Sequence, residues 1–169
     1  ISEPDEPNAK VQASDAVEKL VADLDGSHPL GDAAGWPDAL RFAFRMCLGS
    51  DALAAIYWGP EYRLLYNNAT IPLLGDKHPQ AFGLPAGEVW SETWPRLEPL
   101  LRRVVETGRG FSRTNDRFSL DSKGRRVESY FNYAFVPIID DDGVVAGVLG
   151  QGRETSGIVA NQKWLTSER

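Results

Sequence analysis

The sequence predicts an α+β fold: a five-stranded antiparallel sheet with short helices and one long helix on one face, preceded by N-terminal helices. The spacing of apolar residues changes from a helical period to alternation at about residue 52. One amphipathic stretch then separates two early strand candidates from three late ones. This order of elements is typical of an antiparallel sheet that buries one face under helices.

The first 35 residues are predicted to form an acidic leader with one short helix. Residues 1–13 are rich in proline and acidic residues and have no apolar period, so we expect them to be disordered. Ser14 can cap a helix whose apolar residues are spaced i, i+3, i+4 and i+7. These residues are Val17, Leu20, Val21 and Leu24. Gly26 and Pro29 are expected to end the helix.

A second helix is predicted over residues 37–48, with Pro37 at its first position, where the missing N–H group is harmless. The apolar residues of this helix fall on two sides. Leu40, Phe44, Cys47 and Leu48 form one stripe, while Phe42 and Met46 form another. A helix with two apolar sides usually packs between two surfaces.

Strands are predicted at residues 52–58, 62–66, 111–120, 126–138 and 144–152. Between the second and third strands, residues 67–87 contain so much proline and glycine that only short helical turns can form. The clearest helix covers residues 96–107, where apolar residues recur at helical spacing and Gly108 ends the helix. Pro99 is expected to bend this helix or to delay its start.

The net charge of −6 is concentrated in the leader, because residues 1–40 carry −7 and the remaining residues carry +1. Residues 96–126 hold nine basic and four acidic residues. A nucleic-acid site would need these basic residues on one face, with aromatic residues between them. We favour the interpretation that they lie on the solvent-exposed surface of a helix and at the edge of a hairpin. We therefore predict no nucleic-acid partner. The apolar runs are too short for a membrane span, so we also predict no membrane insertion.

The chain resembles PAS domains over roughly residues 29–156. Residues 137–148 read Pro-Ile-Ile-Asp-Asp-Asp-Gly-Val-Val-Ala-Gly-Val, which is similar to the last hairpin of PAS sensor modules. Further motifs resemble a bacterial subgroup that is fused to sensor histidine kinases. They include Trp36-Pro37, Trp58-Gly59-Pro60-Glu61, Leu65-Tyr66-Asn67-Asn68, Glu88-Val89-Trp90, Trp94 and Arg153-Glu154-Thr155.

The resemblance implies a cytoplasmic sensory module that is a fragment of a bacterial two-component sensor histidine kinase. Residues 36–153 would form the PAS domain, and residues 154–169 would begin its output helix. Ile158 and Leu165 lie one heptad apart, which suits a parallel coiled coil. The resemblance also implies a homodimer, an attached or downstream kinase domain and a small organic ligand between sheet and helices. The alternative is a ligand-free PAS module for protein interaction and dimerisation.

The resemblance further implies which residues line the pocket. Side chains alternate between the two faces of the strand before Pro137, and the pocket face carries Phe131, Tyr133 and Phe135. The opposite row is apolar too, so we expect the helix at 37–48 to cover the outer face. The other candidate ligand-binding residues are Tyr66, Asn67, Trp90 and Trp94. In the alternative interpretation, the two Trp residues fill the core and Asn67 caps a helical turn.

The identity of any cofactor is open, but two possibilities are disfavoured. A flavin–cysteinyl adduct needs a cysteine on the short helices, and the sequence has none between Tyr66 and Arg96. Haem-binding PAS domains use a histidine on or near the long helix, and residues 95–108 contain none. We expect Cys47 to pack as a small apolar side chain and His78 to be a cap or a surface group.

The sequence contains no catalytic motif, so we expect no enzyme activity. It has no nucleotide-binding glycine loop and no nucleophile elbow, and its single cysteine excludes an internal disulfide. The run Asp140-Asp141-Asp142 lacks the later glutamate of a calcium loop and is interpreted as a turn. We predict no metal site.

Overall fold

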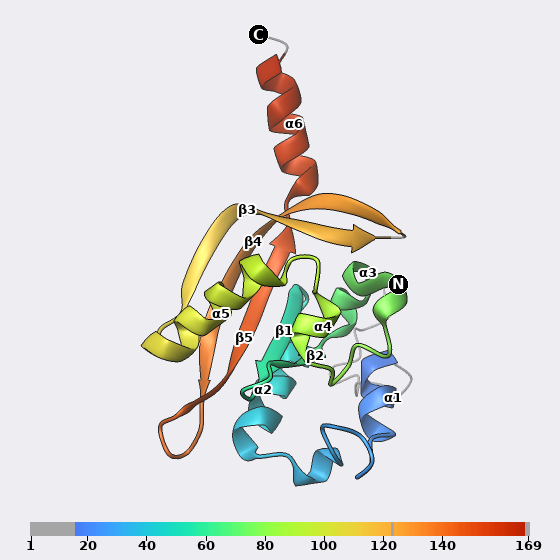
Figure 1. Cartoon of the computed structure of the whole chain (residues 1–169), viewed down its shortest axis with the longest axis vertical. Helices are drawn as coiled ribbons and strands as arrows, with labels where there is room; N and C mark the ends of the chain where they lie inside the picture. Colours follow the sequence, from blue (N-terminus) through green and yellow to red (C-terminus); the bar gives the residue numbers. More distant parts are fainter. Residues whose placement is uncertain (1–15, 123, 168–169) are drawn as a thin grey trace, which may run out of the picture.

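The computed structural model describes residues 16–122 and 124–167 (Figure 1). Five antiparallel strands form one sheet in the order β2-β1-β5-β4-β3. They are β1 (Leu53–Trp58), β2 (Arg63–Tyr66), β3 (Phe111–Ser122), β4 (Arg125–Ile139) and β5 (Val145–Glu154). All five predicted strands are confirmed, and their ends differ from the prediction by at most two residues. The predicted disorder of residues 1–13 and the predicted cap Ser14 lie outside the described residues.

The helices flank both faces of the sheet. They are α1 (Ala16–Ala22), α2 (Asp38–Gly49), α3 (Ile71–Leu74), α4 (Ala86–Val89), α5 (Trp94–Thr107) and α6 (Ser156–Ser167), with 3₁₀ turns η1 (Ala33–Gly35), η2 (Asn68–Thr70) and η3 (Gly75–Lys77). The short helix α4 and the long helix α5 lie in front of the sheet in Figure 1, and α2 lies behind it. The predicted fold, with short helices and one long helix on one face, is confirmed.

The long helix α5 begins at Trp94, two residues earlier than predicted. The first turn of a helix needs no intrahelical donors, so Pro95 is accommodated there without loss. The carbonyl of Thr93 accepts hydrogen bonds from the N–H groups of Arg96 and Leu97, both at 3.0 Å. Pro99 lies beyond the first turn of α5. Because it has no N–H group, it removes one backbone hydrogen bond from this helix.

Helix α2 covers the outer face of the sheet, as expected, and packs against β1, β2 and β4. Its buried residues are Leu40, Ala43, Phe44 and Cys47. The second apolar stripe differs from the expectation, because Phe42 is 57% exposed and Met46 is 60% exposed. Within the described residues, α2 thus packs through one side only, and its other apolar side faces solvent.

Helix α1 is anchored to the domain through Asn68. The Oδ1 atom of Asn68 accepts a hydrogen bond from the N–H group of Val17 at 3.0 Å, and its Nδ2 atom donates to Glu18 at 3.1 Å. Val17 is completely buried. The predicted short helix of the leader is therefore confirmed over Ala16–Ala22, and it packs on the domain.

Helix α6 leaves the sheet directly from the end of β5. The N–H group of Thr155 donates to the carbonyl of Tyr130 at 2.6 Å, and the N–H group of Tyr130 donates to Ser156 Oγ at 3.0 Å. These two bonds fix the base of α6 to the middle of β4. Beyond its base, α6 projects away from the sheet (Figure 1), and Ile158 and Leu165 are exposed.

Candidate ligand-binding site

A cavity of about 120 Å³ lies between the inner face of the sheet and the helices in front of it. Strands β1, β4 and β5 form one wall, and β3 closes the wall with Phe118 and Leu120. Leu73 of α3, Trp90 after α4 and Leu97 of α5 form the opposite wall. The cavity therefore occupies the place between sheet and helices where the sequence predicts a pocket.

Two glycines make room for this cavity on β5. Gly150 and Gly152 pair with Phe135 and Tyr133 of β4 on the cavity side of the sheet. A Cβ atom on Gly150 would lie 2.8 Å from the ring of Phe135, and one on Gly152 would lie 2.6 Å from the carbonyl oxygen of Asn132. The lack of a side chain at these two positions thus allows the rings of Phe135 and Tyr133 to lie close to β5.

The predicted aromatic row of β4 lines the cavity. Phe131, Tyr133 and Phe135 are all buried and all contribute to its wall. The ring centroids of Tyr133 and Phe135 are 4.8 Å apart, and Phe118 lies 5.9 Å from Phe131. Aromatic pairs of this kind favour specific relative orientations, so the rings are held in fixed positions in the cavity wall. Ligand binding by these residues stays a prediction.

The hydroxyl group of Tyr133 is already engaged by the protein. It donates to Asp116 Oδ2 at 2.6 Å, and Arg96 pairs with the other oxygen of the same carboxylate. Burial, followed by the hydrogen bond to Asp116, raises the pKa of Tyr133 above its usual value. A register shift in β3 between Arg113 and Asp116 places this carboxylate opposite β4 on the side of Tyr133.

Trp90 closes the cavity from the helical side and is almost completely buried. Lys77 Nζ lies 4.7 Å from the centre of its ring and donates to the carbonyl of Val89 at 2.8 Å. The same ammonium group pairs with Glu92 at 2.7 Å, and the Glu92 side chain is only 2% exposed. Glu92 also accepts a hydrogen bond from the N–H group of Asp121 at 3.3 Å. This ion pair therefore holds the Trp90 segment against η3 and β3.

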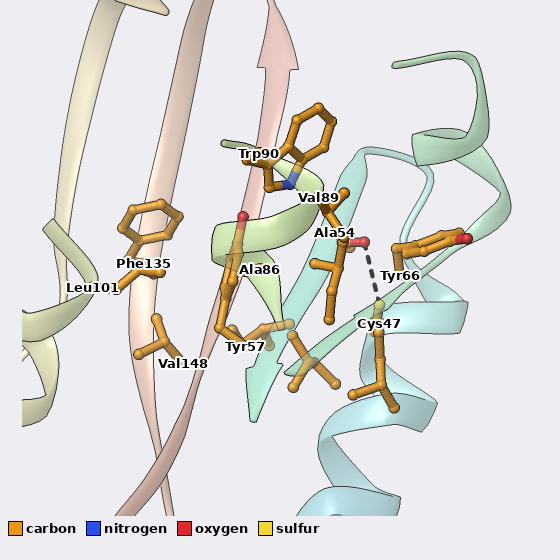
Figure 2. Close-up of a cluster of buried hydrophobic side chains, with 14 of the residues drawn as sticks. Cys47, Ala54, Tyr57, Tyr66, Ala86, Val89, Trp90, Leu101, Phe135 and Val148 are labelled. Carbon is orange, nitrogen blue, oxygen red and sulfur yellow. Dashed lines mark hydrogen bonds between the residues drawn. The ribbon is translucent and has the colours of Figure 1, made fainter. Parts of the chain in front are cut away.

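Tyr57 is a cavity residue that the sequence analysis missed. It lies on β1, pairs with Leu64 and Val148, and packs edge-on against Phe135 at 6.1 Å. Figure 2 shows its hydroxyl group directed toward the space between Trp90 and Phe135. Burial raises the pKa of Tyr57 above its usual value, so the phenol is protonated at neutral pH.

Asn67 lies outside the cavity lining and joins three elements instead. Its Oδ1 atom accepts hydrogen bonds from Ala54 N at 3.2 Å and from Thr70 Oγ1 at 2.8 Å. Its Nδ2 atom donates to the carbonyl oxygens of Cys47, Ser50 and Ala52, at 3.2, 3.3 and 2.8 Å. Asn67 is the N-cap residue of η2, but its side chain makes no cap bond to this turn, and ligand binding by Asn67 stays a prediction. Asn67 is 2% exposed and ties α2, β1 and η2 together.

Tyr66 also lies outside the cavity lining, because it is the last residue of the edge strand β2. Its ring packs against Phe82, with centroids 5.2 Å apart. Its hydroxyl group forms a hydrogen bond of 2.7 Å with His78 Nδ1. His78 is the C-cap residue of η3, in agreement with the expected cap, and its side chain is half-buried with a specific partner.

Trp94 is the third predicted residue that the structure places elsewhere. Its ring packs against Tyr62 at 5.8 Å and against the backbone at Gly87. Trp90 and Trp94 do not share a helix, since α4 ends at Val89 and α5 begins at Trp94. Their spacing of four residues therefore does not bring them to one wall.

A family sequence profile described as PAS fold matches residues 48–157, which is more than half of the chain. The chain belongs to the PAS family. A search of curated protein sequences finds no match.

Solved structures share the PAS fold with this chain at low sequence identity. The PAS domain of a Colwellia psychrerythraea protein is 16% identical with a TM-score of 0.51, and the alignment covers 71% of this chain and 99% of that domain. An RNA-binding Light-Oxygen-Voltage receptor is 16% identical with a TM-score of 0.55, covering 80% and 38% of the two chains. A phage VqmA–DPO complex is 16% identical with a TM-score of 0.52, covering 76% and 58%.

The cavity of this PAS domain adjoins a second hollow of about 440 Å³. The residues that line both are Leu53, Leu73, Leu120 and Gly152. Arg153 and Glu154, at the end of β5, border the second hollow. The two hollows therefore share part of their walls, and the second one extends to the end of β5, the strand that leads into α6.

Cys47 packs in the core of the PAS domain, as expected. Its Sγ atom lies 3.4 Å from the carbonyl oxygen of Ala54, and burial raises the pKa of its thiol to about 12 (Figure 2). Within residues 16–122 and 124–167, no group of three His, Cys, Asp or Glu side chains is arranged to hold a metal ion. None of the helices in these ranges has the length and apolar character to cross a membrane.

The thermal stability of the PAS domain should depend on pH through His78. Burial lowers the pKa of His78 below its usual value, so the unfolded chain binds a proton more readily than the folded one. The melting temperature should therefore fall as the pH drops from about 7.5 to about 5.5. His78→Gln should show a smaller fall over the same range, measured by circular dichroism. An equal fall in both proteins would contradict this role of His78.

Proposed function

We propose that this chain is a cytoplasmic sensory PAS module that binds a small molecule and passes the signal to an attached histidine kinase as a homodimer. In this proposal, residues 1–35 are a leader, residues 36–153 are the sensory domain and residues 154–169 begin the output helix. The observation that carries the proposal is the position of the cavity, which lies against β5 and shares lining residues with a second hollow at the end of this strand, just before α6.

The contacts around β4 suggest how occupancy would be transmitted. Phe131 and Tyr133 line the cavity, and Tyr130, the residue next to Phe131, holds the base of α6 with two backbone hydrogen bonds. A molecule that displaces these rings would therefore change the position of Tyr130. If β4 can take two positions and α6 moves with it, a ligand that binds more tightly to one of these conformations would increase the population of that conformation.

The exposed apolar side chains support the dimer in this proposal. Phe42 and Met46 lie one turn apart on α2, and Ile158 and Leu165 lie one heptad apart on α6. The same exposed residues support the second candidate function, a ligand-free module for protein interaction and dimerisation. None of them lines the cavity, so a dimer formed through them would not require a ligand.

Native mass spectrometry of the purified chain distinguishes these functions. We expect a dimer that carries an additional mass, lost on denaturation. Ala55→Leu, which adds bulk to the β1 wall of the cavity, should remove the additional mass and leave the dimer. Ala134→Leu is the matched control, since Ala134 lies on the opposite face of the sheet and should retain the mass. A dimer without additional mass would support the interaction module, and an empty monomer would contradict both.

A further inference from the structure

Building on the proposed function, we propose that the cavity takes an uncharged molecule of about one ring that carries a group able to hydrogen-bond with Tyr57 Oη. This assignment follows from three properties of the cavity: the charge of its lining, its volume and its free polar groups.

The lining favours an uncharged ligand. Among the described residues that line the cavity, none is Asp, Glu, Lys, Arg or His. Transfer of an unpaired carboxylate or ammonium group from water to such a site is strongly unfavourable. Two carboxylates beside lining residues already have cationic partners, because Asp116 pairs with Arg96 and Glu92 pairs with Lys77. A charged molecule would therefore find no counter-ion in the cavity.

The volume of about 120 Å³ limits the size of the ligand. An engineered apolar cavity of about 150 Å³ in another protein takes up benzene, whereas drug-sized molecules need roughly 300 Å³ or more. A single ring with one or two substituents is therefore the largest planar group that fits without rearrangement. The surrounding edges and faces of Phe131, Phe135 and Trp90 suit an aromatic ring.

The hydroxyl of Tyr57 is one of the polar groups in the cavity lining. The hydroxyl of Tyr133 donates to Asp116, and that of Thr70 donates to Asn67 Oδ1 at 2.8 Å. Tyr57 is 7% exposed, and its hydroxyl forms no hydrogen bond with any described residue. Figure 2 shows it between Trp90 and Phe135. A ligand atom that accepts or donates at this point would add a hydrogen bond to the apolar contacts of the cavity wall.

Four compounds test the assignment by isothermal titration calorimetry with the full chain. Phenol and toluene have the same size, but only phenol can hydrogen-bond. Benzamide and benzoate have the same shape, but only benzoate is charged. We expect phenol and benzamide to bind and benzoate to bind at least tenfold more weakly than benzamide. Tyr57→Phe should weaken phenol about five- to tenfold and leave toluene unchanged. Ala55→Leu and Leu97→Phe, each checked for folding by circular dichroism, should abolish binding.

Three outcomes would overturn the assignment. Equal affinities for benzoate and benzamide would refute the uncharged class. Unchanged phenol affinity in Tyr57→Phe would refute the hydroxyl anchor. Failure of all four compounds to bind the wild-type chain would refute the single-ring size. In each case, a bound mass in native mass spectrometry that Ala55→Leu removes would leave the proposed function standing. The proposed function fails together with the assignment only when that mass is absent too.

Discussion

Replacement of Asn67 by alanine should lower the free energy of unfolding by roughly 2–4 kcal/mol, although Asn67 does not line the cavity. The change removes the acceptor for Ala54 N and Thr70 Oγ1 at the start of β1. It also removes the donor for three backbone carbonyls between α2 and β1. Because these groups lie in a largely buried junction, water cannot fully replace the lost partner. Urea denaturation followed by circular dichroism measures the effect.

Asn132→Ala is the matched control for this prediction. Asn132 lies on β4, is exposed and accepts one hydrogen bond, from the N–H group of Asn115 at 2.8 Å. Its replacement should cost less than about 1 kcal/mol, since water can reach the group that loses its partner. Similar losses for Asn67→Ala and Asn132→Ala would show that the Asn67 network does not hold the junction together.

Replacement of Lys77 by methionine should lower the free energy of unfolding by roughly 2–3 kcal/mol. Lys77 is the counter-ion of Glu92, whose side chain is almost completely buried, and its loss leaves that carboxylate without a positive partner. The change also removes the cation above Trp90 and the donor to the carbonyl of Val89. Chemical denaturation at neutral pH gives the magnitude.

A double-mutant cycle separates the ion pair from the other contacts of Lys77. Glu92→Gln removes the charge that Lys77 neutralises, so the double variant should be less destabilised than the sum of the single variants by about 1 kcal/mol or more. Arg117→Met tests an exposed pair, since Arg117 lies 3.6 Å from Glu128 and both side chains are largely solvent-accessible. Its effect should be below about 1 kcal/mol. Additive single effects at Lys77 and Glu92 would contradict the buried ion pair.

The sheet and the aromatic row of β4 could be predicted from the sequence because they follow local rules. Alternation along a strand assigns Phe131, Tyr133 and Phe135 to one face whatever the neighbouring elements do. Tyr57 escaped the same argument, since β1 reads Leu-Ala-Ala-Ile-Tyr-Trp and is apolar on both faces. The pairing with β5 identifies the cavity face of β1. Gly150 and Gly152 lie on that face of β5 and Gly150 pairs with Ala55, so alternation along β1 places Tyr57 on the same face.

The positions of the other predicted site residues, outside the cavity lining, have tertiary causes. Tyr66 is the last residue of the edge strand β2 and Asn67 follows it, where contacts with the loops before α4 and after α2 decide the direction of the side chain. Trp94 was grouped with Trp90 because the two residues are four positions apart. The helical structure is interrupted between α4 and α5, however, so this spacing does not place them on one helix face. The position of Asp116 depends on a register shift in β3, which has no signature in the local sequence. Such features depend on pairing and packing that no single segment encodes.

The central claim is that an occupant of the cavity is sensed at the base of α6, and amide hydrogen exchange tests this claim most directly. Exchange at residues 152–160 would be measured with and without saturating phenol, in the wild-type chain and in Ala55→Leu. The account predicts slower exchange at the base of α6 in the wild-type chain when phenol is bound and no change in Ala55→Leu. Protection that is confined to the cavity walls, with unchanged exchange at Thr155 and Ser156, would contradict it.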